Sequence, residues 1–203
     1  MHIKSITSNG VEQLLVRVSK AIDKAGIPYM VIGGQAVLLY GTPRLTKDID
    51  ITLGVDVDRL SQVLTIVKQL NLKILKPNYR NFVAQTMVLP LEDSKSKFRV
   101  DFIFSFTPYE TQAIKRAKRV KFGRAVVRFA SLEDIIIHKT FSGRPKDIED
   151  VRAIIIKNPN FDRRYIKKWL KEFDSQPEAR LAKSGQPESG QELLKTFIRV
   201  SQK

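Results

Sequence analysis

The sequence predicts an α/β fold over roughly its first 130 residues, followed by a helical part. Two observations lead to this prediction. Up to residue 130, segments with helical spacing alternate with short apolar runs typical of strands, whereas only helical patterns follow from Ser131 to about residue 174. A chain of 203 residues with 42% hydrophobic residues can form one compact domain with an appendage, or two small domains, and is not disordered as a whole.

The first elements are a helix, a strand and a short helix. Residues 10–25 are expected to form an amphipathic helix, because their apolar residues recur at helical spacing. Residues 28–32 form a short apolar strand that ends at Gly33 and Gly34, and residues 35–40 form the next helix. The apolar positions of the first helix are Val11, Leu14, Leu15, Val18 and Ile22.

The next pair is a strand over residues 47–53 and a helix over about 57–70. In the strand, Asp48, Asp50 and Thr52 alternate with Ile49, Ile51 and Leu53, which predicts a half-buried strand with both carboxylates on one face. In the helix, Leu60, Val63, Leu64, Val67 and Leu70 recur at helical spacing.

Strand patterns then dominate up to residue 130. We expect strands at 72–76, 81–90 and 97–105, a short helix near 108–117, and a hairpin that pairs 118–122 with 125–129 across Gly123.

Helical patterns follow at 132–142, 146–157 and 162–173. The segment from Ser131 to Asp134 resembles a capping box, with Asp in place of the usual Glu. The expected organisation is an α/β domain over 1–130, a helical domain over 131–174, a polar linker rich in Pro, Gly and Ser over 175–190, and an amphipathic helix over 191–203. A second capping box at Ser189 to Glu192 opens this last helix.

Composition limits the classes of function. The chain has no cysteine, so it has neither disulfides nor thiolate sites, which fits a reducing compartment. The longest uncharged run, from Ile27 to Pro43, is too short to span a membrane, and the first ten residues contain no apolar leader region. We therefore expect a cytoplasmic protein without membrane association.

The net charge of +15 is unevenly distributed. No acid occurs between Asp58 and Glu92, and none between Glu110 and Glu133, although both stretches contain several bases. Such runs often form only a solvated face, but two of them in a basic chain favour a polyanionic partner. The second stretch holds Lys115, Arg116, Lys118, Arg119, Lys121, Arg124 and Arg128.

Three aspartates and two glycines form the chemical pattern. Asp48 and Asp50 are two residues apart on a strand, so their carboxylates point the same way, and a divalent cation such as Mg²⁺ would relieve their repulsion. Asp101 interrupts an apolar strand and needs a partner or a metal. Arg99 is expected to be poorly placed for it, on the argument that neighbouring strand residues point to opposite faces.

Gly33 and Gly34 lie where a strand passes into a helix. Their missing side chains would let a phosphate approach the backbone N–H groups at the helix N-terminus, although an isolated Gly-Gly is more often a plain tight turn.

Together, the segment GGQAVLLYGTPRLTKDIDITL resembles the signature of the polymerase-beta-like nucleotidyltransferases. The later segment HKTFSGRPKDIEDV is similar to an element of the bacterial branch with AbiEii-type abortive-infection and toxin–antitoxin enzymes. The resemblance covers residues 28–157. It implies a central mixed β-sheet flanked by helices, with 1–130 as the catalytic domain, and transfer of a nucleoside monophosphate from a nucleoside triphosphate to a hydroxyl with release of pyrophosphate.

The resemblance also implies roles for residues. Gly33 and Gly34 would hold the triphosphate, and Asp48, Asp50 and Asp101 would ligate Mg²⁺, two ions in all. Asp101 would also be the base for the acceptor hydroxyl. In the helical part, Lys139 would neutralise phosphate charge, Asp147 would orient Lys139 or the nucleotide, and Arg144 and Lys146 are further phosphate contacts. The alternative for Lys139, Asp147 and Asp150 is an ordinary ion-pair cluster between two helices.

Three acceptors and one non-catalytic function remain open from the sequence. The basic charge favours RNA, and tRNA in particular, as for toxins of this branch, and such an enzyme would have a cognate antitoxin protein as partner. An aminoglycoside-like small molecule is the enzymatic alternative, although a cationic drug prefers an acidic pocket. Transfer to a protein is also open. A non-catalytic antitoxin or RNA-binding module is disfavoured by the three aspartates, because isolated buried acids are costly.

Overall fold

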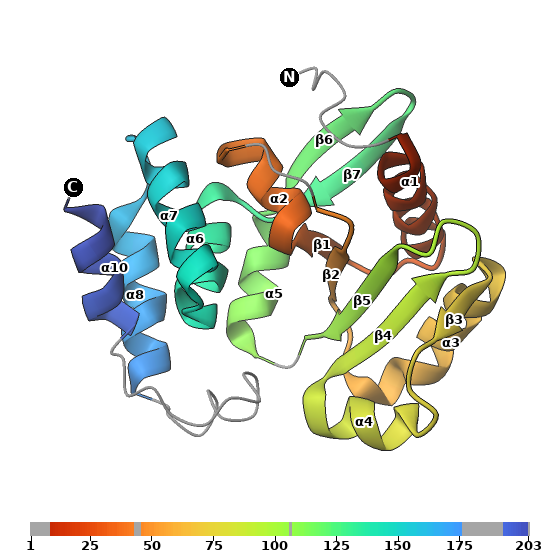
Figure 1. Cartoon of the computed structure of the whole chain (residues 1–203). Helices are drawn as coiled ribbons and strands as arrows, with labels where there is room; N and C mark the ends of the chain where they lie inside the picture. Colours follow the sequence, from red (N-terminus) through yellow and green to blue (C-terminus); the bar gives the residue numbers. More distant parts are fainter. Residues whose placement is uncertain (1–8, 43–45, 106, 176–192, 203) are drawn as a thin grey trace. The chain divides into compact units, whose positions relative to one another are not determined.

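The computed structural model describes residues 9–42, 46–105, 107–175 and 193–202 (Figure 1). It divides into two compact units. Unit 1 comprises residues 1–36 and 44–130, and unit 2 comprises residues 37–43 and 131–203. The helix α2 (Gly33–Tyr40) therefore begins in unit 1 and ends in unit 2.

Unit 1 is built on a mixed sheet. Within the described residues the sheet has seven strands in the order β3-β4-β5-β2-β1-β7-β6 (Figure 1). β2 pairs in parallel with β5 and antiparallel with β1, and β1 pairs in parallel with β7. The strands are β1 (Tyr29–Ile32), β2 (Ile49–Leu53), β3 (Leu72–Ile74), β4 (Val88–Asp93), β5 (Arg99–Phe104), β6 (Lys118–Phe122) and β7 (Ala125–Phe129).

The sequence predicts β2 to be half-buried, and the structure corrects this in part. Ile49, Ile51 and Leu53 are fully buried as expected, but Thr52 on the other face is also buried, at 1% exposure. Only Asp50 of this strand is partly exposed. The end of β2 is thus covered on both faces, and the open part of the carboxylate face lies at its beginning.

The helices of unit 1 bury the apolar faces that the sequence predicts. α1 (Asn9–Lys24) packs against β7, and α5 (Pro108–Lys115) packs against β1. α5 begins with a capping box between Thr107 and Glu110. The predicted helix at 57–70 is a 3₁₀ turn, η1 (Val57–Arg59), followed by α3 (Leu60–Gln69).

The predicted strand at 81–90 is wrong over its first half. Residues 79–86 form the helix α4 (Tyr79–Thr86), and β4 begins only at Val88. Met87 separates the two elements with a left-handed φ of 58°, and its N–H donates to the carbonyl of Val83. Val83 is the buried residue of α4, and a single buried side chain in eight residues leaves no helical spacing of apolar residues for the sequence to show.

Unit 2 is helical. Its helices are α6 (Leu132–Ser142), α7 (Pro145–Lys157), α8 (Arg163–Asp174) and α10 (Leu193–Ser201). Ser131 is the N-cap of α6, as predicted, because its hydroxyl accepts from the N–H of Asp134 at 3.2 Å. The predicted capping box at Ser189 to Glu192, and the predicted linker apart from Ser175, lie outside the described residues.

The last helix docks on its own unit. α10 packs on α8, α7 and α6, and Phe197 is fully buried. At its N-terminus, both oxygens of the Asp174 carboxylate accept backbone hydrogen bonds, from Leu193 at 2.9 Å and from Leu194 at 3.0 Å. A carboxylate at a helix N-terminus satisfies free N–H groups and matches the helix dipole.

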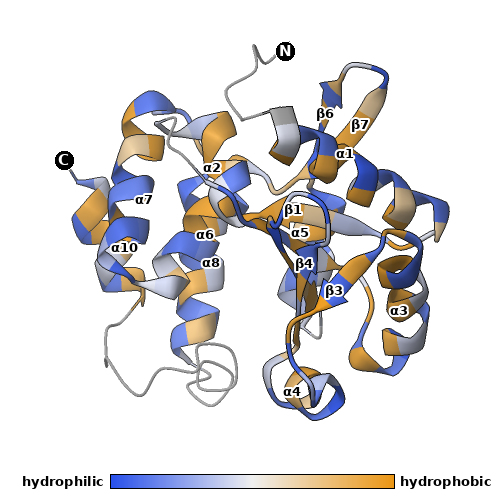
Figure 2. Cartoon of the chain, turned by 45° about the vertical axis from the view of Figure 1, so that its right-hand side comes forward, coloured by the Kyte–Doolittle hydropathy of each residue, from blue (hydrophilic) through white to orange (hydrophobic). Residues whose placement is uncertain are grey.

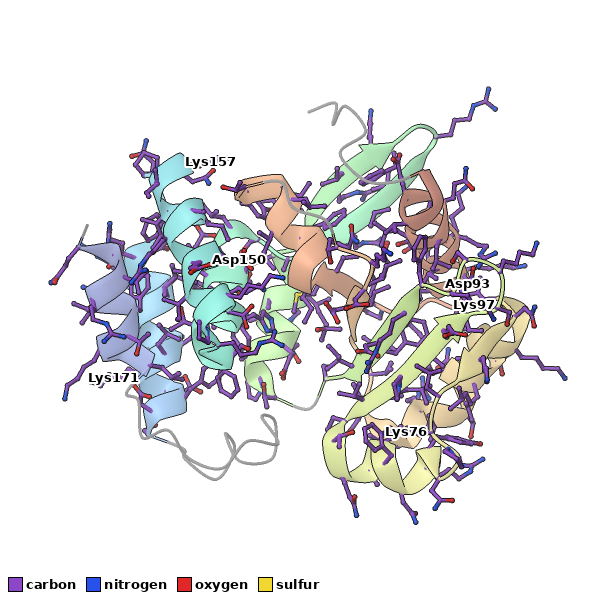
Figure 3. The ribbon with its side chains drawn as sticks, in the orientation of Figure 1. Lys76, Asp93, Lys97, Asp150, Lys157 and Lys171 are labelled. Atoms are coloured by element: carbon purple, nitrogen blue, oxygen red, sulfur yellow. The ribbon has the colours of Figure 1, made fainter. Side chains whose placement is uncertain are left out.

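The end of α2 is held by α7. Lys157 Nζ donates to the carbonyl of Gly41 at 2.7 Å, and Asn158 Nδ2 donates to the carbonyl of Tyr40 at 2.8 Å. Figure 3 shows Lys157 beside the end of α2. These bonds satisfy two of the carbonyls that a helix leaves unpaired at its C-terminus.

Hydropathy follows the layers of the fold. In Figure 2 apolar residues concentrate on the strands and on one face of most helices. No helix among the described residues is long and apolar enough to cross a membrane.

The hairpin β6–β7 is present as predicted, and β6 lies at an edge of the sheet with Lys118, Arg119 and Lys121 exposed.

Replacing Phe197 tests the docking of α10. Phe197→Ala should lower the free energy of unfolding by about 3–5 kcal/mol, because it leaves a cavity at a fully buried ring. The matched control is Ile156→Ala on α7, where the side chain is 76% exposed and the change should stay within about 0.5 kcal/mol. Urea unfolding of the full chain measures both, and equal effects would contradict the docked arrangement.

Candidate active site

The turn between β1 and α2 requires glycine. Gly33 has a φ of +63°, a region that L side chains rarely adopt, and a β-carbon there would lie 1.8 Å from Oδ2 of Asp50. A β-carbon at Gly34 would lie 2.5 Å from Oγ1 of Thr46. The backbone at the start of α2 therefore approaches the carboxylate of Asp50 so closely that a side chain at Gly33 does not fit.

Two of the predicted aspartates are neighbours across the sheet. In the parallel pair β2–β5, Asp50 is in register with Asp101, so the two side chains share a face on strands about 4.8 Å apart. Asp48 is exposed and lies one residue before β2. The predicted acids thus come together at the open beginning of β2, next to Gly33.

The expectation for Arg99 is wrong. Arg99 and Asp101 are two residues apart, so they share a face of β5, and Arg99 Nε donates to Oδ1 of Asp101 at 3.0 Å. The expectation treated them as adjacent residues on opposite faces. Burial, together with the charge of Asp48, nevertheless raises the pKa of Asp101, against the lowering effect of Arg99.

Arg99 interacts electrostatically with all three carboxylates. The hydrogen bond to Asp101 raises the pKa of the Arg99 guanidinium, and the negative charges of Asp101, Asp48 and Asp50 add to this. Within the described residues no group of three or more His, Cys, Asp or Glu side chains is arranged to hold a metal ion. The donor chemistry, carboxylate oxygens on one face, is that of Mg²⁺, while one oxygen of Asp101 is bound to Arg99.

One residue that supports this site, Gln35, was not predicted from the sequence. Gln35 is 3% exposed, and its Nε2 lies 3.3 Å from the carbonyl oxygens of both Thr46 and Asp48, to which it donates. Gln35 therefore ties the first turn of α2 to the backbone that carries Asp48. The sequence shows only an amide directly after two glycines, and the fold reveals its burial and its partners.

Substitution of Gly33 tests the close approach to Asp50. Gly33→Ala should lower the free energy of unfolding by about 2–4 kcal/mol, because the left-handed φ and the clash add. Gly26→Ala is the matched control: its φ is +67° but nothing lies within 4 Å, so only about 1 kcal/mol for the φ is expected. In urea unfolding, Asp50→Ala should rescue the excess, and equal losses at both glycines would contradict the contact.

The second group of predicted residues forms a buried cluster in unit 2. Lys139 Nζ of α6 lies 2.5 Å from Oδ1 of Asp147 and 3.0 Å from Oδ2 of Asp150, both on α7 (Asp150 is labelled in Figure 3). Lys139 is 6% exposed and Asp147 is 2% exposed. This geometry is the ion-pair arrangement between two helices that the sequence left open.

Asp147 is the centre of that cluster. Ser142 Oγ and Arg144 Nε also donate to it, each at 2.6 Å. Burial alone would raise the pKa of Asp147, but the hydrogen bonds from Lys139, Ser142 and Arg144 outweigh it and lower the pKa. Ser142 was not predicted. Arg144 and Lys146 at the start of α7 are both exposed.

His138, next to Lys139, has no sign of acid–base chemistry. Desolvation lowers the pKa of its ring to about 4, so the imidazole is neutral at pH 7.

The predicted site residues fall into two groups. Unit 1 contains Gly33, Gly34, Asp48, Asp50 and Asp101, and unit 2 contains Lys139, Arg144, Lys146 and Asp147.

Removal of Lys139 should be costly in a pH-dependent way. Lys139→Ala leaves two buried carboxylates without their shared cation and should lower the free energy of unfolding by about 3–5 kcal/mol at pH 7. Because the folded pKa of Asp147 is lowered, its stabilising contribution is complete above its unfolded pKa of about 3.9 and is lost as the pH falls through the folded value. The free energies of unfolding of the variant and the wild type should therefore approach each other as the pH falls below about 3.9.

The control for this change is Lys146→Ala, an exposed position that should cost less than about 0.5 kcal/mol. Denaturant unfolding at pH 7 and at pH 3 measures both variants. A Lys139→Ala loss that does not shrink at pH 3 would contradict the ion-pair account.

Residues 10–180 match the family described as "Nucleotidyltransferase of unknown function (DUF6036)". The chain belongs to this family. The match contains both groups of candidate residues. No curated protein sequence matches this nucleotidyltransferase-family chain.

Solved structures agree with the family in fold. The crystal structure of ANT(2")-Ia in complex with adenylyl-2"-tobramycin has a TM-score of 0.56 at 19% identity, covering 82% of this chain and 98% of that one. A putative nucleotidyltransferase from H. pylori has a TM-score of 0.50 at 17% identity, with 96% of each chain covered. The lincomycin-bound lincosamide adenylyltransferase LnuA has a TM-score of 0.50 at 16% identity, covering 73% and 96%. The α/β fold is that of the nucleotidyltransferases.

Proposed function

We propose that this chain is a metal-dependent enzyme that transfers a nucleoside monophosphate from a nucleoside triphosphate to a hydroxyl group and releases pyrophosphate. The observation that carries the proposal is the meeting of the glycine turn at Gly33 with Asp50, and of Asp50 with Asp101, on one face of the sheet. Membership of the nucleotidyltransferase family supports the same reaction.

In this proposal the first turn of α2, at Gly33 and Gly34, binds the triphosphate through backbone N–H groups. Asp48, Asp50 and Asp101 hold Mg²⁺, which supplies charge stabilisation for phosphoryl transfer. The raised pKa of Asp101 suits the base that accepts the proton of the acceptor hydroxyl. The positive charge of Arg99 offsets part of the negative charge of these carboxylates.

The helical unit has a separate part in the proposal. Asp147 holds Arg144 at the start of α7 by accepting a hydrogen bond from its Nε, and it accepts a second one from Lys139. Arg144 and Lys146 are exposed and contact phosphate, while the buried Lys139 pairs with Asp147 and Asp150 and thereby supports the start of α7.

RNA, with tRNA as the first choice, is the proposed acceptor, as in the toxin-like AbiEii-type branch that would also have an antitoxin partner. The net charge of +15 and the exposed bases of the hairpin β6–β7 support a polyanion. Lys118, Arg119, Lys121 and Arg124 of this hairpin have no acidic partner in the described part of the chain.

A small-molecule acceptor is the second candidate. The fold similarity to ANT(2")-Ia and LnuA, whose structures contain an adenylylated aminoglycoside and lincomycin, favours testing it. At 19% and 16% identity this similarity concerns the fold, so the acceptor has to be measured.

A label-transfer assay tests both the reaction and the acceptor. The full chain with Mg²⁺ and each α-labelled nucleoside triphosphate is incubated with tRNA, with an aminoglycoside mixture, or with cell lysate. Asp48→Asn should reduce transfer by more than about 100-fold, because loss of a metal ligand exceeds the effect of removing its supporting partner. Asp58→Asn, an exposed aspartate with the same charge change, should retain activity.

Each outcome decides a part of the proposal. Label on tRNA supports the enzyme and its acceptor, whereas label on the drug or on a lysate protein keeps the reaction and overturns the acceptor. No label in any mixture, or equal label with Asp48→Asn, would refute catalysis by this site.

A further inference from the structure

The exposed face of α8 is strongly basic. Five of its twelve residues are exposed bases, while the opposite face of the helix is buried. In Figure 2 hydrophilic residues run along α8 and alternate with apolar ones. The exposed bases are Arg163, Arg164, Lys167, Lys168 and Lys171, and the buried residues are Tyr165, Ile166, Trp169 and Leu170.

The acids at both ends of α8 are used inside unit 2. Asp162 caps the helix and accepts from the N–H groups of Arg164 and Tyr165, each at 3.0 Å. Asp174 accepts from the N-terminus of α10. Both carboxylates therefore bind backbone and do not pair with the bases of the exposed face.

Lys168 Nζ lies 5.1 Å from the centre of the Trp169 ring, and Arg163 has a hydrogen-bond acceptor within the unit. The Arg163 guanidinium lies 3.4 and 3.5 Å from the carbonyl oxygen of Ser201, at the end of α10. The other four have no acidic partner among the described residues. We call Arg164, Lys167, Lys168 and Lys171 the α8 basic face.

This arrangement is unfavourable for the helix itself. Arg164 and Lys168, like Lys167 and Lys171, are four residues apart, a spacing at which like charges repel. Arg164 also lies in the first turn, where the helix dipole disfavours a cation. Glu172 of α8 stands four residues after Lys168, but no ion pair joins it to these bases in the described part of unit 2. An external anion would relieve both penalties.

The dimensions fit a chain of phosphates. Seven residues separate Arg164 from Lys171, which corresponds to about 10 Å along the helix axis. Over that distance a nucleic acid duplex presents several phosphates, since it carries one charge per about 1.7 Å of its axis.

A membrane surface fits less well. A basic amphipathic helix binds lipid by inserting its apolar face. The apolar face of α8 is already buried in unit 2, with Ile166 and Leu170 fully buried and Trp169 4% exposed. Only the charged face is available to a partner.

We propose that the α8 basic face binds the phosphate backbone of the RNA acceptor. This inference rests on the RNA acceptor proposed above and adds a surface on the helical unit that holds it, in addition to the reacting hydroxyl in unit 1.

The test compares two triple variants of the full chain with the same change of net charge. Lys167→Gln/Lys168→Gln/Lys171→Gln removes three bases of the α8 basic face, and Gln has nearly the helix propensity of Lys. The control, Lys20→Gln/Lys24→Gln/Lys95→Gln, removes three exposed lysines of unit 1 that lie outside the two acid-free stretches. Circular dichroism confirms that both variants are folded, and fluorescence anisotropy measures binding to tRNA between about 50 and 200 mM salt.

The α8 variant should bind tRNA about 10- to 100-fold more weakly at low salt, and its slope of log K against log salt should be smaller by about 2–3, one unit or slightly less for each lost phosphate contact. The control should change the affinity by less than about threefold. Equal losses in both variants, no loss in the α8 variant, or no tRNA binding by the wild type would overturn the proposal.

Vesicles containing phosphatidylserine are tested in parallel. Loss of vesicle binding in the α8 variant with unchanged tRNA binding would assign the face to lipid and overturn the RNA proposal.

Label transfer separates this inference from the proposed function. If the wild type labels tRNA but the α8 variant binds and labels it equally well, the inference alone fails. If the wild type labels no tRNA but the α8 variant loses tRNA binding selectively, the acceptor proposal fails and the binding surface stands.

Discussion

The register of β2 with its two neighbours fixes the candidate site. Asp50 is the partner of Ile32 on β1 and of Asp101 on β5. Because Ile32 directly precedes Gly33, this double register places the glycine turn and the second carboxylate beside the same residue. A slip by one residue would turn Asp50 to the other face and bring Ile49 or Ile51 out of the core. The burial of those two isoleucines therefore protects the geometry of the site.

The two groups of carboxylates are compensated in different ways. Asp147 accepts hydrogen bonds from three donors of its own unit, which lower the pKa of its carboxyl and compensate its negative charge within the folded unit. Asp101 has a single guanidinium donor, lies near Asp48 and has a raised pKa, so its ionised form is under-compensated within the protein. The compensated carboxylate of Asp147 stabilises the pair of helices α6 and α7. The carboxylate of Asp101 can still bind a cation or a proton.

The sequence predicted those features that depend on local pattern and missed those that depend on partners. Helical spacing identified α1, alternation identified β2, and a glycine between two apolar runs identified the hairpin. The spacing of Asp48 and Asp50 predicted a common face, and the family resemblance grouped Asp101 with them, but neither predicted that Arg99 shares the face of Asp101. α4 was misread because eight residues with one buried side chain carry too little periodicity. The α8 basic face was not predicted, because Asp162 and Asp174 flank it in the sequence. Only the folded structure shows that these two acids bind the N-termini of α8 and α10.

The edge position of β6 has a consequence for the behaviour of the chain in solution. An edge strand offers unpaired N–H and C=O groups on which a strand of another molecule can add, and exposed lysines are a common protection against such growth. Lys118 and Lys121, with Arg119 between them, give β6 this protection through mutual repulsion between molecules. Repulsion between exposed charges is screened over about 10 Å at 0.1 M salt and over about 3 Å at 1 M. The protein should thus resist aggregation through this edge best at low ionic strength and least in concentrated salt.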